Sequence, residues 1–447
     1  MMKYKVGLIS LGCDKNRVDA EVMLHELKQN GFEIVNDEKI ADIIIVNTCG
    51  FIESAKMESI ETILEMAQNK QEGNCKAVIA TGCMAERYKQ DLLNEMPELD
   101  AVVGTGNYQN IVEVVNNILK GNNKIVKVGN INYNLEYNER ILSTPNHYAY
   151  LKIAEGCNNN CSYCIIPQLR GRYRSRKIED IIKEAKQLAN IGVKELIIVA
   201  QDTTMYGIDI YKKKSLSMLL KEIEKIEGIE WIRVMYSYPE EIDDELIETI
   251  KNSQKICRYF DMPIQHISDK ILKLMNRRTT KQKILNVIDN IRKNIPDAVI
   301  RTSLIVGFPN ETDDDFNELV EFIKEYKLDR VGIFEYSQEE GTRAALLDNQ
   351  ISDEVKTYRK EKLMKIQSKI ALEKNMKLIG NEVNVIIDGK TNEGMYFGRT
   401  YADAPEIDQT VYFDASKDYN RGDIVSVKIT KAYNYDLLGV DVNEFSK

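Results

Sequence analysis

The sequence predicts an α/β protein with three successive parts: a doubly wound parallel α/β domain, a partial barrel of six βα units of the TIM type, and a small all-β barrel. Strand and helix patterns alternate over residues 1–120 and again over residues 144–375. Residues 376–447 form short strands between Gly, Asp and Asn turns. Residues 121–143 break the alternation and are expected to link the first two parts.

The N-terminal part contains four apolar runs with strand character, which are KVGLISL, DIIIVNT, AVIATG and AVVGTG. Residues with helical periodicity follow the first three runs, which favours a parallel sheet covered on both faces. The linker is rich in Asn and Tyr and lacks a helical period. We interpret it as an ordered connection or a pair of strands.

The central part contains six strand candidates, which are YAYLKIAEGC, ELIIVAQD, WIRVMYSYP, RYFDMPIQH, AVIRTSLIVGFP and RVGIFEYSQ. Helical stretches separate them, which predicts a barrel or partial barrel, with an open doubly wound sheet as the alternative. A long charged helix follows over residues 351–379. The strands expected in the terminal barrel, of the oligomer-binding (OB) type, are NEVNVIIDG, EGMYFGRT, QTVYFD and DIVSVKITKAY.

Composition indicates a cytoplasmic protein. The chain has 447 residues, of which 43% are hydrophobic and 29% charged. No run approaches the roughly 18 apolar residues of a membrane span, and the N-terminus lacks the apolar region of a signal peptide. The net charge of −9 gives no sign of the basic face of a general nucleic-acid binder. We therefore expect no membrane partner.

Three cysteines lie within eight residues in the sequence CNNNCSYC, and these are Cys157, Cys161 and Cys164. Three thiolates suit a 4Fe–4S cluster whose fourth iron stays open to a small molecule. The loop directly follows a strand and so belongs to the carboxyl end of the barrel, where barrel active sites lie. The alternative is a zinc knuckle, for which His147 is the one nearby fourth ligand.

A second trio of cysteines shares one position relative to the predicted sheet. Cys13, Cys49 and Cys83 each follow a strand directly, so all three belong to the carboxyl edge, where α/β folds bind ligands. We predict that they form a second three-thiolate site; three unrelated buried thiols are the alternative. Cys75 and Cys257 precede their strands and are expected to be bystanders.

Polar residues gather at the carboxyl ends of the six barrel strands. Together they fit a polar, zwitterionic ligand held above the first cysteine trio, although His266 is equally well explained as a core histidine. In chain order these residues are Gln201, Asp202, Tyr236, Tyr238, Gln265, His266, Arg301, Thr302, Ser337, Gln338, Glu339 and Glu340.

The C-terminal part is acidic. Residues 377–447 carry eight basic and twelve acidic residues, a net charge of −4, and the loop 403–409 reads DAPEIDQ. An oligonucleotide-binding barrel usually offers a positive groove, so the charge favours a basic protein partner over RNA. An acidic face that only contacts water is the alternative.

Motifs along almost the whole chain, from Lys5 to about Val440, resemble those of the radical S-adenosylmethionine (SAM) methylthiotransferases. The resemblance is nearest to the branch that modifies an aspartate of small-subunit ribosomal protein S-twelve. The stretches around Cys49 and Asp403 distinguish that branch from the one acting on transfer RNA. The matching motifs are LGCDKNRVDAE, NTCGFIESAKMES, AEGCNNNCSYCIIP, RGRYRSR, VAQDTTMYG, RTSLIVGFPNET, YSQEEGT and GRTYADAPEIDQ.

The resemblance implies two 4Fe–4S clusters and two molecules of SAM for each reaction. Cys157, Cys161 and Cys164 would hold the cluster that generates a 5′-deoxyadenosyl radical, which takes hydrogen from the aspartate β-carbon. The other trio would hold an auxiliary cluster that carries the sulfur. A flavodoxin- or ferredoxin-type protein would supply electrons, and no RNA substrate is expected. The expected cofactor contacts are Tyr163, Gln201, Asp202, Gln265, His266, Arg301 and Glu311.

Two residues depart from the family pattern: Asn310 stands where Gly is usual, and Asp14 replaces a frequent Pro. Neither removes an expected ligand. Two other functions stay open from the sequence. One is methylthiolation of a modified adenosine in transfer RNA, and the other is a non-enzymatic iron–sulfur redox protein that docks through its terminal barrel.

Overall fold

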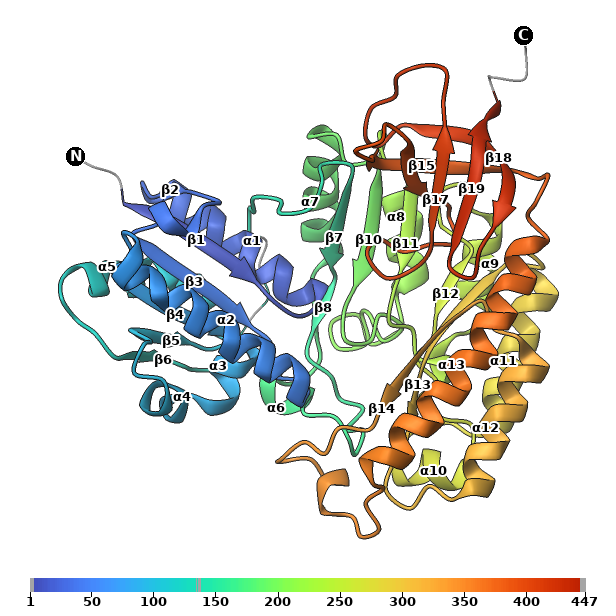
Figure 1. The fold of residues 1–447 in the computed structure, drawn as a ribbon, viewed down its shortest axis with the longest axis horizontal. Helices are drawn as coiled ribbons and strands as arrows, with labels where there is room; N and C mark the ends of the chain where they lie inside the picture. Colours follow the sequence, from blue (N-terminus) through green and yellow to red (C-terminus); the bar gives the residue numbers. More distant parts are fainter. Residues whose placement is uncertain (1–3, 134, 136–137, 443–447) are drawn as a thin grey trace. The chain divides into compact units, whose positions relative to one another are not determined.

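The computed structural model describes residues 4–133, 135 and 138–442 (Figure 1). Residues 134, 136 and 137 of the predicted linker and 443–447 of the predicted terminal part lie outside the described residues. Contacts divide the chain into two compact units. Unit 1 comprises Met1–Ser143, Lys152–Asp180 and Ser337–Ala345, and unit 2 comprises Thr144–Leu151, Ile181–Tyr336 and Leu346–Lys447.

Unit 1 is built on a six-stranded sheet in the order β2-β1-β3-β4-β5-β6, with every neighbouring pair parallel. Its strands are β1 (Lys5–Ser10), β2 (Glu33–Ile34), β3 (Ile43–Thr48), β4 (Ala77–Gly82), β5 (Ala101–Val103) and β6 (Ile125–Lys127). Its helices are α1 (Asp14–Gln29), α2 (Glu53–Glu72), α3 (Cys83–Tyr88), α4 (Gln90–Glu95) and α5 (Ile111–Leu119), with short 3-10 turns η1 (Glu38–Ile40) and η2 (Tyr108–Asn110).

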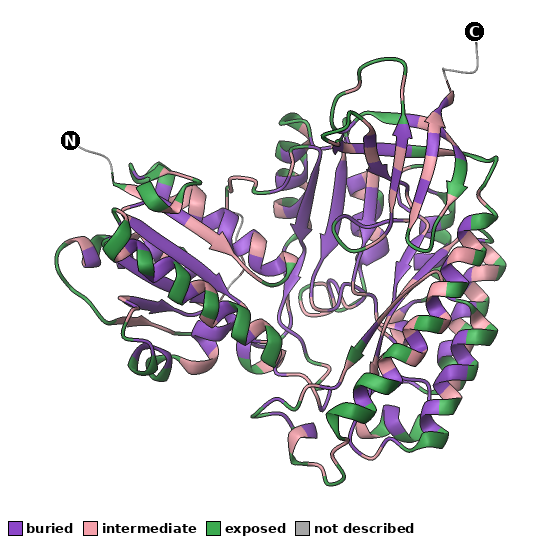
Figure 2. Cartoon of the chain, in the orientation of Figure 1, coloured by how far each residue is buried: buried purple, intermediate pink, exposed green. Residues whose placement is uncertain are grey.

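Helices cover both faces of this sheet. On β3, Ile43 and Ile45 pack in a cluster with α1 and α5, whereas Ile44 and Val46 pack in a second cluster with α2, α3 and α4. Because both faces are buried, the strand is apolar at every one of its first four positions. Figure 2 shows β3 and β4 buried along their lengths. The predicted doubly wound parallel domain is confirmed.

One strand of the sheet comes from the predicted linker. β6 pairs in parallel with β5, with Val102 opposite Val126. The run Ile125–Lys127 is only three residues long and half-buried, which is why its pattern gave no clear strand signal. The beginning of the linker is therefore an edge strand of the N-terminal sheet.

The rest of unit 1 carries the Cys157 loop. The antiparallel pair β8 (Ala154–Glu155) and β9 (Arg174–Ser175) flanks this loop, and the short helix α6 (Ile166–Arg170) follows it. Ile165 and Leu169 pack in one apolar cluster with Cys83 and Phe51. The segment that carries Cys157, Cys161 and Cys164 therefore packs against α3, whose first residue is Cys83.

Unit 2 contains two three-stranded sheets, β11-β10-β7 and β12-β13-β14. The amide of Ile232 donates to the Lys255 carbonyl at 2.8 Å, and the amide of Ser237 donates to the Asp261 carbonyl at 2.9 Å, so backbone bonds join the two sheets at β11 and β12. The six strands follow one another in chain order, as the predicted partial barrel requires. They are β7 (Tyr148–Lys152), β10 (Glu195–Val199), β11 (Trp231–Val234), β12 (Tyr259–Asp261), β13 (Val299–Val306) and β14 (Arg330–Glu335).

Helices alternate with these strands along the chain, and the long charged helix predicted after the sixth strand is α13. The helices are α7 (Ile178–Asn190), α8 (Leu216–Glu224), α9 (Asp244–Asn252), α10 (Asp269–Leu274), α11 (Lys281–Asn294), α12 (Asp313–Tyr326) and α13 (Asp353–Met376), with 3-10 turns η3 (Pro239–Glu241) and η4 (Ala344–Leu346). Across the described residues, every helix lacks either the length or the apolar character that crossing a membrane requires.

The C-terminal strands close into a barrel in the order β15-β16-β17-β19-β18. They are β15 (Glu382–Lys390), β16 (Tyr396–Arg399), β17 (Thr410–Asp414), β18 (Ile424–Ala432) and β19 (Asp436–Asp441). Val385, Val411, Phe413, Val427 and Leu437 fill the interior. The sequence predicted four of these strands and missed β19, which pairs in parallel with β17 and antiparallel with β18, and so completes the closure.

Candidate active site

Cys13, Cys49 and Cys83 lie at the carboxyl ends of β1, β3 and β4, which are adjacent strands of the unit 1 sheet. Cys13 is the N-cap of α1, Cys49 directly follows β3, and Cys83 is the first residue of α3. The structure therefore brings together the three loops that the sequence assigned to one edge.

Two glycines allow these loops to approach closely. A Cβ added to Gly12 would lie 3.2 Å from Cys49 Sγ, and Gly12 also has a positive φ of 84°. A Cβ added to Gly50 would lie 2.9 Å from the carbonyl carbon of Cys83. Larger residues at either position would push the cysteine loops apart.

The three thiols influence one another electrostatically. Burial raises the pKa of Cys83 to about 12, the guanidinium of Arg170 opposes that rise, and the charges of Cys13 and Cys49 add to it. Burial also raises the pKa of Cys49, with a further contribution from Cys13. A thiolate form of all three requires a compensating positive charge, which a bound metal cluster supplies.

The loop that carries Cys157, Cys161 and Cys164 has a fixed backbone. The amide of Cys157 donates to the Gly171 carbonyl at 3.2 Å, and the amide of Cys164 donates to the Cys161 carbonyl at 3.1 Å. Cys157 and Cys161 are buried, whereas Cys164 and the neighbouring Tyr163 are half-buried. The loop thus presents its third cysteine and the aromatic ring toward the more open side.

The donor set of each trio fits an iron–sulfur cluster. All eight cysteines are free thiols, and soft sulfur donors select iron–sulfur clusters or zinc. The fourth zinc ligand considered from the sequence, His147, is committed elsewhere, since its Nε2 lies 2.6 Å from Asp388 Oδ1 in unit 2. In the part of the chain that the structure describes, no three His, Cys, Asp or Glu side chains already stand at metal-binding distances.

The segment Ser337–Ala345 contacts the loops of both trios within unit 1. The Arg87 guanidinium donates to Glu339 Oε2 at 2.8 Å and to the Gly50 carbonyl, directly after Cys49, at 2.9 Å. The amide of Ala344 donates to the Ser162 carbonyl at 2.8 Å. Glu339, which the sequence placed in a ring of ligand-facing residues, is thus engaged in holding this segment.

Several predicted cofactor contacts follow the strands of unit 2. Gln201 and Asp202 come after β10, and Asp202 Oδ1 accepts a hydrogen bond from the Thr204 hydroxyl at 2.5 Å. Tyr236 and Gln265, after β11 and β12, have positive φ angles of 59° and 73°. Positive φ angles are uncommon outside glycine, and here they turn the chain directly after two barrel strands. The cofactor contacts at this edge stay predictions.

His266 has the environment of a core histidine, the alternative that the sequence left open. Its Nδ1 accepts a hydrogen bond from the Ser268 amide at 3.0 Å, and its ring is fully buried. Burial lowers the pKa of His266 to about 3. The nearby Glu311 pairs with Arg359 at 3.0 Å, and burial raises the pKa of Glu311 to about 7 against the opposing effect of that arginine. For both residues, a cofactor contact stays a prediction.

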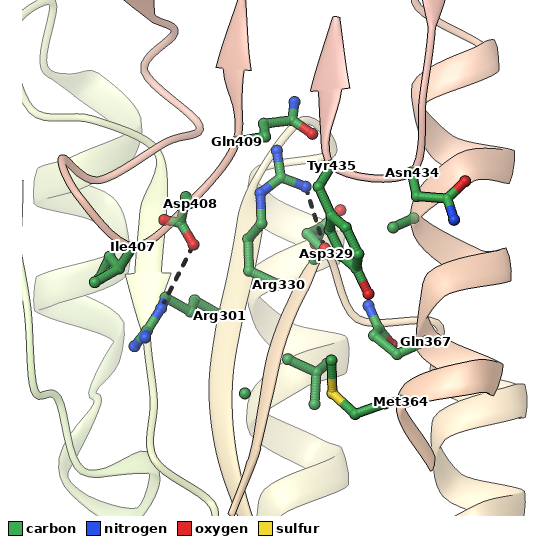
Figure 3. A pocket seen from close by; sticks show the side chains of 13 residues that line it. Arg301, Asp329, Arg330, Met364, Gln367, Ile407, Asp408, Gln409, Asn434 and Tyr435 are labelled. Atoms are coloured by element: carbon green, nitrogen blue, oxygen red, sulfur yellow. Dashed lines mark hydrogen bonds and ion pairs between the residues drawn. The ribbon is translucent and has the colours of Figure 1, made fainter. Parts of the chain in front are cut away.

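Arg301 lies near the amino end of β13, as the third of its eight residues. Its Nη1 donates to Asp261 Oδ1 at 2.7 Å, and its Nε lies 3.6 Å from Asp408 Oδ1. Arg301 and Arg330 line a cavity of about 290 Å³. In Figure 3, Asp408 lies beside Arg301 on the loop of the terminal barrel. These ion pairs account for Arg301 without a ligand, and its predicted cofactor contact has no support from them.

The acidic loop 403–409 does not expose most of its charge. Asp403 is fully buried and accepts hydrogen bonds from Arg330 at 2.7 Å and from the Thr400 hydroxyl at 2.6 Å. Asp408 accepts a hydrogen bond from the Tyr259 hydroxyl at 2.6 Å. Glu406, the third carboxylate of the loop, accepts a hydrogen bond from the Tyr148 hydroxyl at 3.2 Å. The loop therefore presents less negative charge at its surface than its composition suggests.

The two departures from the family pattern have local explanations. Asn310 has a positive φ of 68°, a conformation that Gly adopts freely and Asn tolerates better than most residues. Asp14 is the first residue of α1, a position where Pro is common and where a carboxylate interacts favourably with the helix dipole. Asn310 therefore costs less at its position than most other residues would, and Asp14 is favourable at the start of its helix.

Sequence reasoning gave no role to Arg170, although it lies in the quoted motif RGRYRSR. Its guanidinium is 3.6 Å from Cys83 Sγ and also reaches Asp19 and Asn16 of α1. Nothing in the local sequence connects these residues, because they lie between 87 and 154 positions away from Arg170. The one feature of the sequence that could have indicated a role for Arg170 is the basic motif that follows the Cys157 loop.

Family models match all three parts of the chain. Residues 5–104 match uncharacterized protein family UPF0004, residues 151–323 match the Radical SAM superfamily, and residues 379–442 match the TRAM domain. Together with the three cysteines of the Cys157 loop, these matches define a radical SAM enzyme with an added N-terminal α/β domain and a terminal TRAM barrel.

Relatives with full-length similarity narrow the class. A Clostridioides difficile protein named ribosomal protein uS12 methylthiotransferase RimO is 56% identical over 97% of this chain and 98% of its own length. A protein of that name from Clostridium perfringens is 54% identical over the full length of both chains. The chain belongs to the RimO family of radical SAM methylthiotransferases. Membership implies SAM and 4Fe–4S clusters as cofactors.

Solved structures agree on the fold. The radical SAM methyltransferase TsrM from Kitasatospora setae, solved with cobalamin and a [4Fe-4S] cluster, has a TM-score of 0.55 and 14% identity over 75% of each chain. The same enzyme with tryptophan and a SAM analogue gives a TM-score of 0.56.

Proposed function

We propose that this enzyme adds a methylthio group to the β-carbon of an aspartate in ribosomal protein uS12. The observation that carries the proposal is the presence of two cysteine trios in one compact unit of a RimO-family chain. An aspartate β-carbon offers no handle for acid–base chemistry, so the reaction needs cofactors that perform radical chemistry.

Each trio has a separate role in this proposal. Cys157, Cys161 and Cys164 hold the cluster with an open iron, and Cys13, Cys49 and Cys83 hold the auxiliary cluster. When bound, the clusters and two SAM molecules supply a hydrogen-abstracting radical, a sulfur atom and a methyl group. The protein places the N-terminal trio at strand ends and buries Cys83, Cys157 and Cys161, which keeps water away from half of the sulfur ligands.

The proposal also covers the cofactor contacts, the electron donor and the roles of the domains. We propose cofactor contacts for Tyr163, Gln201, Asp202, Gln265, His266, Arg301 and Glu311, of which Gln201, Asp202 and Gln265 have the strand-end placement that supports them. Electrons come from a flavodoxin- or ferredoxin-type donor, and the enzyme acts in the cytoplasm. We assign the auxiliary-cluster domain to residues 1–120, the linker to 121–143, the radical SAM core to 144–375 and substrate recognition to 376–447; the linker also supplies the edge strand β6 of the N-terminal sheet.

Transfer RNA is the competing substrate. The net charge of −4 over residues 377–447 argues against an RNA-binding surface on the barrel. Asp403 and Asp408 pair with Arg330 and Arg301, which lie outside residues 377–447, so without these two carboxylates the net charge of that segment is −2, which is still acidic.

The test supplies anaerobically reconstituted enzyme with SAM, a reductant, and either uS12 or transfer RNA. Mass spectrometry of both substrates then locates any methylthio group. The proposal predicts modification of one aspartate of uS12 and none of the RNA. Modification of the RNA alone would overturn the choice of substrate.

A further inference from the structure

Arg170, the last residue of α6, contacts residues from three other segments of unit 1. Its Nη1 donates to the Asp19 carboxylate and to Glu155 Oε2, the latter at 3.2 Å. Its Nη2 donates to Asn16 Oδ1 at 2.9 Å and lies 3.6 Å from Cys83 Sγ. The Arg170 side chain is 2% exposed, so these contacts form away from water and are strong for that reason.

Asn16 extends this network to the loops of the other two cysteines in the N-terminal trio. Its amide nitrogen donates to the Leu11 carbonyl, in the loop after β1, at 2.9 Å. It also donates to the Thr48 carbonyl, directly before Cys49, at 3.2 Å. Arg170 and Asn16 together therefore contact all three loops that carry the trio.

The charges around Arg170 are balanced. Lys152 Nζ lies 2.5 Å from Asp19 Oδ1 and 2.8 Å from Glu155 Oε2, so two buried cations face two buried carboxylates. The two cations differ in one respect that concerns the cluster: Lys152 contacts the carboxylates and the face of the Tyr108 ring, whereas Arg170 also reaches the sulfur of Cys83. Removing either cation changes the buried charge equally, but removing Arg170 also removes a donor to a ligand sulfur.

We propose that Arg170 is a positioning residue for the auxiliary cluster, which holds the Cys83 sulfur in place and raises the reduction potential of that cluster. The inference rests on the proposed function, which assigns Cys83 as a ligand. Hydrogen bonds to ligand sulfurs and nearby positive charge favour the reduced form of a cluster, which carries one more negative charge. Glu155, two residues before Cys157, shares the Arg170 guanidinium, so this network also connects the auxiliary site to the radical-cluster loop.

The test uses the full-length chain with Cys157, Cys161 and Cys164 changed to Ala, which leaves the auxiliary site alone. After anaerobic reconstitution, iron and sulfide are measured. A redox titration then follows the reduced cluster by electron paramagnetic resonance, with dithionite donating one electron to each cluster. The variants Arg170→Gln and Lys152→Gln are made in this background as a matched pair.

In Arg170→Gln, the ratio of reduced to oxidised cluster at a given potential falls about tenfold, which is about 59 mV for a one-electron couple. In Lys152→Gln, the same ratio changes less than about threefold, because the donor to Cys83 remains. Equal shifts in the two variants would overturn the inference, since they would show that buried charge alone sets the potential.

A third variant covers the case in which Arg170→Gln does not fold. Arg170→Lys keeps the charge, but an ammonium group lacks the planar, two-armed geometry that reaches the carboxylates and the sulfur together. We expect the same direction of shift, by about threefold, and an unshifted potential would contradict the inference. If the chain with Cys157, Cys161 and Cys164 changed to Ala binds no iron, the proposed auxiliary site is overturned as well. If that chain binds iron but the Arg170 variants leave its reduction potential unchanged, only the role of Arg170 is overturned.

Discussion

Arg330 on β14 and Asp403 in the loop between β16 and β17 form a buried ion pair, with 2.7 Å between Arg330 Nη2 and Asp403 Oδ1. Asp403 is fully buried, and it also accepts a hydrogen bond from the Thr400 hydroxyl. The pair joins the terminal barrel to the sixth strand of the partial barrel within unit 2. The contacts of Asp403 therefore serve the structure of unit 2.

Arg330→Met should destabilise unit 2 by about 3–5 kcal/mol, because it leaves the Asp403 carboxylate buried without its partner. Chemical denaturation followed by circular dichroism measures the change. The matched control is Lys225→Met, which breaks the exposed pair with Glu222 and should cost less than about 1 kcal/mol. Equal losses in the two variants would contradict the structural role of the Asp403 pair.

Cys75→Ala and Cys257→Ala should retain the full iron content of the reconstituted enzyme. The Cys75 thiol donates to the Ala77 carbonyl at 3.2 Å at the start of β4, at the opposite edge from the cysteine trio. Cys257 is buried near Arg233, and burial raises its pKa to about 11. Iron and sulfide analysis after anaerobic reconstitution checks this prediction. A loss of iron equal to that of Cys83→Ala would show that the residue concerned is a cluster ligand.

His266→Gln should make the stability of the protein less sensitive to acid. The folded state holds the pKa of His266 near 3 through burial, whereas the unfolded chain has the ordinary value near 6.5. The titration of His266 therefore does not change the free energy of unfolding above pH 6.5. As pH drops from 6.5 toward 3 the free energy of unfolding decreases, because only the unfolded state binds the proton.

The difference in slope between wild type and His266→Gln should reach about 1 kcal/mol per pH unit below pH 6.5. Urea denaturation at a series of pH values measures it, and the glutamine amide can still accept the Ser268 hydrogen bond. Parallel curves for the two proteins would show that the imidazole is protonated in the folded state.

The positions of the cysteines were predictable because they depend on local patterns. An apolar strand with Cys at or shortly after its end fixes which edge of a parallel sheet the thiol occupies: Cys49 and Cys83 directly follow β3 and β4, and Cys13 comes three residues after the end of β1. The strand β19 was missed although it pairs with the neighbouring strand β18. Its six residues, DLLGVD, include one glycine and two aspartates, which are depleted in strands and weaken the local pattern.

Side-chain pairing between distant segments was not predictable either. The loop 403–409 counts as acidic by composition, yet Arg330 and Arg301 come from other strands and neutralise Asp403 and Asp408. Arg170 reaches Cys83 only because α6 packs on α3. Charge counts and motif spacing describe the chain one segment at a time, whereas these contacts depend on the folded arrangement.

The most direct test of two separate cluster sites is a variant that lacks the N-terminal cysteine trio. Its iron content and the products of its reaction are measured together. Wild type should hold about eight irons per chain. The variant with Cys13, Cys49 and Cys83 changed to Ala should hold about four, should still form 5′-deoxyadenosine from SAM, and should leave uS12 without a methylthio group. Wild-type iron content in this variant, or methylthiolated uS12 among its products, would contradict the account.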